Sequence, residues 1–277
     1  MACGRERGNR KVYHWPMDHS ADQPAAQAAP RIRIVLVGTQ HPGNIGSAAR
    51  AMKTMGLSRL VLVAPERFPH PEARALAAGA DDLLDAATVH AGLAAAVADC
   101  TLVLGCTARS RRVPLPESGP REAAAAMHAH AAAGGEVALV FGRERTGLDN
   151  DELQLCHGAV HIPADPGYSS LNLAAAVQVL AWELRAAMLA GGSAPAGDPR
   201  DPPASHAELE GLFAQLADTL DAIDFHKGRA PESAMRKLRR IYLRAGLDVR
   251  EVRLLRGVLA DAQRMARLAR GGGDASE

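Results

Sequence analysis

The chain has 277 residues and a mass of 29.1 kDa, which fits one large domain or one domain with an extension. Hydrophobic residues make up 47% and charged residues 23%, and this ordinary globular usage excludes collagen-like, mucin-like and wholly disordered chains. No run approaches about 18 strongly apolar residues, so we expect no membrane span. Aromatic residues are only 3%, so Leu, Val, Ile and Ala must fill the core.

The net charge of +1 hides a strong segregation of charge along the chain. Residues 226–270 hold thirteen lysines and arginines against four aspartates and glutamates, so they carry a formal +9 and the rest of the chain −8. A basic C-terminal third predicts either a polyanionic partner or a solvated helical face, and charge alone does not separate these two readings.

The cysteine and histidine patterns argue against a metal site. The four cysteines form no CxxC pair, the histidines show no metal-ligand spacing, and neither HExxH nor GxSxG occurs. No apolar core region follows the basic residues near the N-terminus, so we expect no secretory signal. These patterns predict a cytoplasmic protein with reduced thiols and no bound metal.

Short apolar runs alternate with helical patterns through the first two thirds of the chain. Strands are predicted at 32–37, 60–63, 102–104, 137–141 and 160–162, and helices at 44–55, 72–78, 90–98, 121–133 and 170–189. The strands are apolar on both faces, which is typical of a parallel sheet covered on both sides. The pattern predicts an α/β domain over 31–190.

The ends of the chain have a different character. Residues 1–30 show no apolar period and are predicted to be a mobile, disordered tail. Residues 191–204 are rich in Pro and Gly and are predicted to be a linker. A basic helical extension is predicted over 205–277, with helices at 208–223, 232–244 and 249–270.

Three polar clusters each follow a predicted strand, where ligands collect in open parallel sheets. The first, 38–50, is a glycine-bearing loop that opens a helix, but it has neither the P-loop lysine nor the dinucleotide-binding glycines. The second, 141–148, contains Glu144 in a tight loop. The third, 162–173, enters the longest helix of the domain. Asn44 and either Ser169 or Ser170 fit helix N-caps, whereas Asn172 within an apolar helix start needs a polar partner.

Taken in order, the three clusters resemble the three motifs of the SpoU branch of the SPOUT RNA 2′-O-methyltransferases. The matching patterns are Asn44-x-Gly46-x3-Arg50, then Gly142-x-Glu144-x2-Gly147-Leu148, then Pro163-x5-Ser169-Ser170-Leu171-Asn172-x3-Ala176. The resemblance covers 31–190. Segments 31–37, 51–57, 107–111, 224–229 and 235–240 further resemble the branch that methylates the 2′-oxygen of nucleotide 32 in bacterial tRNA.

This resemblance implies a fold, a cofactor and partners. It implies a parallel-sheet SPOUT domain with a deep C-terminal trefoil knot, S-adenosylmethionine as methyl donor, tRNA as substrate, and a homodimer whose subunits share each active site. Methylation of cytidine or uridine at position 32 is the expected reaction. A ribosomal RNA substrate and a non-catalytic knotted RNA-binding module are the alternatives.

The family roles carry over to matching positions of this chain. The methyl-donor pocket would be formed by Cys106, Thr107, Ala108, Gly142, Ile162, Ser169, Ser170 and Leu171. The catalytic and RNA-facing residues would be Asn44, Arg50, Glu144, Ser170 and Asn172. The further RNA-binding residues of the extension would be Lys227, Arg229, Arg236, Lys237, Arg239 and Arg240.

Arg50 is the family's candidate for activating the ribose hydroxyl. A guanidinium does not give up its proton near neutral pH, so it is a poor general base. We therefore expect Arg50 to polarise the hydroxyl or to bind the adjacent phosphate, with the proton leaving through phosphate or water.

Overall fold

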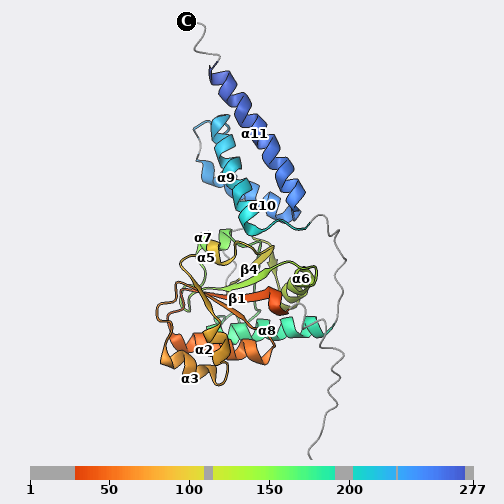
Figure 1. Ribbon diagram of the computed structural model, residues 1–277. Coiled ribbons are helices and arrows are strands. Elements are labelled where there is room, and N and C mark those ends of the chain that lie inside the picture. The colour runs from red at the N-terminus through yellow and green to blue at the C-terminus, as the bar shows by residue number, and fades with distance from the viewer. Residues whose placement is uncertain (1–28, 109–114, 191–201, 229, 272–277) are drawn as a thin grey trace, which may run out of the picture.

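The computed structural model describes residues 29–108, 115–190, 202–228 and 230–271 (Figure 1). At its centre is a seven-stranded sheet in the order β3-β2-β1-β6-β4-β7-β5, in which every pairing is parallel. The strands are β1 (Ile32–Val37), β2 (Arg59–Val63), β3 (Thr88–His90), β4 (Leu102–Cys106), β5 (Glu117–Ser118), β6 (Val137–Phe141) and β7 (Gly158–Val160). The predicted α/β class with a parallel sheet is confirmed.

Helices cover both faces of the sheet, and a short 3-10 turn, η2 (Ala29–Arg31), precedes β1. One face carries α2 (Pro42–Thr54), α3 (Pro71–Ala77), α4 (Asp81–Asp85), α6 (Pro120–Ala132) and α8 (Leu173–Leu189). The other carries α5 (Leu93–Ala96) and α7 (Asn150–Gln154). Alternate β1 residues serve the two layers: Ile34 and Leu36 pack into the first core, Val35 and Val37 into the second.

The packing of α2 against α3 depends on one glycine of the first motif. A Cβ atom on Gly46 would lie 2.0 Å from the carbonyl oxygen of Ala73, so no larger residue fits between the two backbones. In Figure 1, α2, α3 and α8 lie together beneath the sheet. This close approach fixes the helix that carries Asn44 and Arg50.

The extension forms a separate helical layer that projects away from the sheet (Figure 1). It consists of α9 (His206–Ala222), α10 (Pro231–Ala245) and α11 (Val249–Gly271), with a small core that includes Leu212, Phe213 and Val252. The N–H groups of His206 and Ala207 donate to the carbonyls of Cys100 and Ala98 at 2.8 and 2.9 Å, which attaches α9 to the turn before β4.

The helix and strand boundaries agree with the sequence analysis in most places. Strands 32–37 and 137–141 are as predicted, but the sequence does not predict β3, β5, α4 or α7 as they stand, because these elements are only two to five residues long. Pro203 and Ala204, placed in the predicted linker, instead pair with the joint between α10 and α11 at Asp248 and Leu247. The predicted tail and linker otherwise lie outside the described residues, except for 29–30 and 202.

Two kinds of feature do not occur in the part of the chain that the structure describes. Within the described ranges, no helix is both long and apolar enough to span a bilayer. Across those ranges, no group of three or more His, Cys, Asp or Glu side chains is arranged to hold a metal ion.

Candidate functional site

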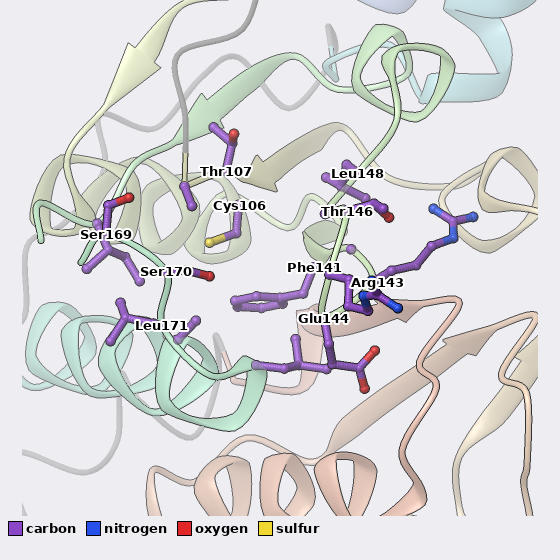
Figure 2. Close-up of a pocket in the computed structure, with 17 residues that line it drawn as sticks. Cys106, Thr107, Phe141, Arg143, Glu144, Thr146, Leu148, Ser169, Ser170 and Leu171 are labelled. Atoms are coloured by element: carbon purple, nitrogen blue, oxygen red, sulfur yellow. The ribbon is translucent and has the colours of Figure 1, made fainter. Parts of the chain in front are cut away.

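A cavity of about 440 Å³ opens beyond the carboxyl ends of β4 and β6, beside the start of α8. The walls come from four segments that are distant in sequence: 106–108, 141–148, Ile162, and 169–171 with Leu173 and Ala176. Figure 2 shows the Cys106 sulfur and the Ser170 hydroxyl turned toward the middle of this cavity. The eight residues predicted to hold the methyl donor all line it: Cys106, Thr107, Ala108, Gly142, Ile162, Ser169, Ser170 and Leu171. Their binding role stays a prediction.

Glu144 joins the second motif to the first. Its carboxylate accepts hydrogen bonds from the backbone N–H of Gln40 at 3.1 Å, from that of His41 at 3.2 Å, and from Asn44 Nδ2 at 2.9 Å. Partial burial by itself would raise the pKa of Glu144, but these hydrogen bonds outweigh it and hold the pKa below its usual value. The carboxylate is therefore ionised at neutral pH and can only accept hydrogen bonds.

The third motif reaches the same network through its asparagine. Asn172 Nδ2 donates to Asn44 Oδ1 at 3.3 Å, and Asn172 Oδ1 accepts the N–H of Ala174 at 2.9 Å. Asn172 is thus the N-cap of α8, and the predictions that Ser169 or Ser170 caps this helix and that Asn172 lies inside it are wrong. Asn44 is not a cap either, because α2 begins at Pro42 after His41.

Arg50 lies apart from this network. It is exposed on α2 and does not contribute to the cavity wall. Ser170, Leu171 and Asn172 are also exposed, so the cavity opens at the surface beside the start of α8. The structure therefore brings together Asn44, Glu144 and Asn172, but it does not bring Arg50 to the cavity within one protomer.

The cavity has no activated thiol among its described residues. Burial raises the pKa of Cys106 to about 12, and the same cause raises the pKa values of Cys100 and Cys156 to about 12. These thiols are protonated at neutral pH and are weak nucleophiles. Cys106 is therefore a poor candidate for a covalent nucleophile in this cavity.

The support of the second motif is a feature that sequence reasoning missed. Arg143 forms a bidentate pair with Glu152 of α7, with both N–O distances 3.0 Å. The loop folds back at once, because Gly147 N–H donates to the Arg143 carbonyl at 2.8 Å and a Cβ atom on Gly142 would lie 2.1 Å from the backbone of Gly147. In the sequence, this ion pair is indicated only by a basic residue, Arg143, and an acidic residue, Glu152, placed on either side of a short loop.

The predicted RNA-binding residues of the extension do not all face solvent. Lys227, Arg236, Lys237 and Arg240 are exposed, and Arg229 lies outside the described residues. The Arg239 side chain is only 15% exposed, because it pairs with Glu210 and lies 4.4 Å from the centre of the Phe213 ring. The guanidinium of Arg239 is therefore engaged within the protein, and we leave it out of the proposed RNA-facing surface.

Two family models match the chain. The SpoU rRNA methylase family matches residues 31–182, and the C-terminal domain of the tRNA methyltransferase TrmJ matches 207–271. The two matches cover most of the predicted α/β domain and most of the predicted helical extension.

Similar proteins extend this match to nearly the whole chain. A tRNA (cytidine/uridine/adenosine-2′-O-)-methyltransferase TrmJ from Pseudomonas aeruginosa is 51% identical over 245 residues, which cover 86% of this chain and 95% of that protein. A tRNA (cytidine/uridine-2′-O-)-methyltransferase TrmJ from Yersinia enterocolitica is 47% identical over 89% of this chain and 96% of its own length. The crystal structure of TrmJ from Z. mobilis superimposes with a TM-score of 0.72 at 38% identity and covers 83% of this chain and 97% of that one. With both family models matched in order, the chain belongs to the SpoU methylase family and, within it, to the TrmJ family.

Proposed function

We propose that the protein is a tRNA ribose 2′-O-methyltransferase that uses S-adenosylmethionine and acts on cytidine and uridine at position 32. The observation that carries this proposal is the convergence of the three motifs, through Glu144, Asn44 and Asn172, at the rim of one cavity. The printed activities of relatives that match both the methyltransferase domain and the extension support the choice of tRNA and of the ribose oxygen.

The cavity suits the proposed methyl donor in size and chemistry. Its volume of about 440 Å³ is within the ordinary range for small-molecule sites. Apolar side chains, including Phe141, Ile162 and Leu171, offer surface to an adenine ring, and hydroxyls such as those of Thr107 and Ser170 offer partners for its ribose and amino-acid groups. When bound there, the cofactor supplies a methyl group on an already activated sulfonium.

The protein's own task in this reaction is alignment. Transfer is an in-line displacement, so the ribose oxygen has to be held opposite the sulfur. Asn44 and Asn172 have both donor and acceptor atoms and fix the rim where the ribose would lie. Glu144 keeps the Gln40–Asn44 loop in place by accepting three of its N–H groups.

A homodimer accounts for the position of Arg50. Because Arg50 is exposed and outside the cavity wall of its own protomer, the proposed role at the ribose needs the partner subunit's Arg50 at the cavity. The guanidinium then polarises the hydroxyl or holds the neighbouring phosphate. The trefoil knot that the resemblance implies stays a prediction, and part of the chain that would form it, 109–114, lies outside the described residues.

The extension supplies the attraction for tRNA. Lys227, Arg236, Lys237 and Arg240 are exposed and basic, and such groups bind phosphates without regard to sequence. The match of 207–271 to the TrmJ C-terminal domain favours tRNA over the ribosomal RNA alternative. Intact Arg50, Glu144, Ser170 and Asn172 favour an active enzyme over a non-catalytic binding module.

Two experiments test the proposal. S-adenosylmethionine should raise the melting temperature of the purified protein, because a ligand that binds only the folded state stabilises it. Mass spectrometry of nuclease fragments of tRNA from a strain that lacks the gene should show loss of 2′-O-methylation at position 32, restored by the wild-type gene. Unchanged methylation in the deleted strain would contradict the proposed function.

A further inference from the structure

Helix α7 lies between the cavity loop and the helical extension, and both sides hold it through arginines. On the cavity side, Arg143 forms the bidentate pair with Glu152 of α7. On the extension side, an NH2 group of Arg239 donates to the carbonyl oxygen of Gln154, the last residue of α7, at 3.0 Å. The two contacts lie two residues apart on one short helix.

The contact from Arg239 is well defined. The same guanidinium donates to both carboxylate oxygens of Glu210 on α9, at 2.9 and 2.5 Å, and it stacks over the Phe213 ring. These partners fix the planar group, so the second N–H of Arg239 Nη2 points at the C-terminal end of α7. Carbonyls at a helix C-terminus have no partner within the helix, and a cation there is favourable.

The rest of α7 is packed against the strand that leads into the cavity. Leu153 is 2% exposed in the core on the sheet face opposite α2 and α8. A Cβ atom on Gly105 would lie 3.3 Å from Leu153 and 3.0 Å from Leu148, and the next residue after Gly105 is Cys106 of the cavity wall. A displacement of α7 therefore changes the wall on two sides, at the 143–148 loop and at the end of β4.

We propose that Arg239 of the helical extension is a positioning residue for the methyl-donor cavity. It acts through α7, which lies between Arg239 and the cavity loop. The inference rests on the proposed function. It assigns the extension a second task besides attraction of RNA: α10 holds α7 in the position in which Arg143 and Leu148 form the cavity wall. By linkage, binding of the methyl donor favours docking of the extension to the same degree.

The neighbouring residue provides a matched control. Arg240 follows Arg239 in α10, but it is exposed. Arg239→Met and Arg240→Met remove the same charge from the same helix and keep a long apolar stem. Only the first removes the hydrogen bond to α7.

The test measures the affinity of the full-length protein for S-adenosylmethionine by calorimetry, without tRNA. We expect Arg239→Met to weaken binding about 3- to 10-fold, because residues on a coupling route change binding by about that much, and Arg240→Met to leave it unchanged. A double-mutant cycle with Glu152→Gln should give a combined loss smaller than the product of the two single losses, because both changes loosen the same helix. A merely structural role would lower the melting temperature without altering the affinity of the folded protein.

Each other outcome has a definite meaning. Equal affinity in Arg239→Met and wild type, or fully additive effects with Glu152→Gln, would overturn the role of Arg239 and leave the proposed function intact. No binding by the wild-type protein would overturn the proposed function and this inference with it. If Arg239→Met does not fold, Arg239→Lys replaces it, since lysine keeps the charge but cannot hold Glu210 and Gln154 together. Wild-type affinity in that variant would equally overturn the inference.

Discussion

The Asn172 side-chain amide donates to Asn44 Oδ1 at 3.3 Å, although the two residues are 128 positions apart. Asn44 in turn donates to Glu144, so one line of hydrogen bonds joins loops that follow β1, β6 and β7. The side-chain NH2 group of Asn172 donates to Asn44, and the side-chain NH2 group of Asn44 donates to Glu144. The position of each loop at the cavity rim therefore depends on the other two.

Asn172 performs two tasks that substitutions can separate. Asn172→Asp keeps the oxygen that caps α8 through Ala174 N–H but removes the donor to Asn44. We expect a melting temperature near that of wild type and a fall in kcat/KM of about fivefold, since removal of a hydrogen bond costs about 1 kcal/mol. Asn172→Ala should reduce the activity and also cost about 1 kcal/mol of stability, because it removes the cap. Equal activity in Asn172→Asp and wild type would rule out the donor role.

Glu144→Gln removes the negative charge and replaces one acceptor oxygen with an NH2 group, which cannot accept a hydrogen bond from the loop at Gln40. We expect kcat/KM to fall about 10- to 100-fold, because hydrogen bonds to a charged group are worth about 1.5–3 kcal/mol. The matched control is Glu66→Gln, since Glu66 accepts an exposed hydrogen bond from the same Gln40. Steady-state kinetics of the two variants check this, and losses of equal size would show that the effect is not specific to Glu144.

Arg50→Lys tests how the ribose hydroxyl is activated. If Arg50 only polarises the hydroxyl or binds phosphate, the pH–rate profiles of the wild type and Arg50→Lys share their ionisations and differ in height. Lysine keeps the charge but not the planar fork, so we expect kcat to fall about tenfold or more. Disappearance of one ionisation from the variant's profile would identify Arg50 as the proton acceptor instead.

His157 makes the stability of the protein depend on pH. Burial, followed by repulsion from His206 and His130, lowers the pKa of His157 to about 4. Between about pH 6.5 and this value the unfolded chain binds a proton that the folded protein does not, so the free energy of unfolding falls as the pH falls. We expect this residue to contribute a loss of about 2 kcal/mol between pH 7 and pH 5.

The measurement is urea unfolding of the wild type and His157→Asn at both pH values. Asparagine can accept the N–H of Val103 that His157 Nδ1 accepts at 3.1 Å, but it does not titrate. The variant should therefore show a smaller difference between the two pH values. An equal difference in both proteins would contradict the assignment.

The exposed basic residues of the extension are expected to act through charge alone. Replacement of Lys227, Arg236, Lys237 and Arg240 by Gln should weaken tRNA binding and reduce the slope of log affinity against log salt by about 0.7–0.9 for each phosphate that is no longer neutralised. Affinity for the methyl donor should not change. Filter binding at several salt concentrations gives the slope, and a slope equal to that of wild type would show that these residues do not bind the tRNA backbone.

The sequence predicts the parallel sheet because buried strands are continuous apolar runs, which a local pattern reveals. Gly142 and Ser170 can be assigned to one site only through the resemblance of their loops to the family motifs. The cap at Asn172 cannot be placed in this way, because serine and asparagine have similar preferences for that position. The contact with Asn44 that distinguishes them is distant in sequence.

The partners of the arginines could not be predicted in the same way. Arg239 and Arg240 are adjacent and chemically identical, yet one is engaged with Glu210 and Gln154 while the other is exposed. Helix periodicity places Arg239 and Arg240 on different faces of α10, but it does not predict which of these faces packs against α7. That choice depends on how α9 attaches to the turn before β4, through the N–H groups of His206 and Ala207.

The most direct test is methyl transfer by the purified protein to unmodified tRNA, with S-adenosylmethionine labelled in its methyl group. Nuclease digestion and mass spectrometry then locate the label. The account predicts the methyl group on the 2′-oxygen of nucleotide 32, and transfer that is about 10- to 100-fold less efficient in Glu144→Gln. A label on a base or at another nucleotide, or no transfer by the wild-type protein, would contradict it.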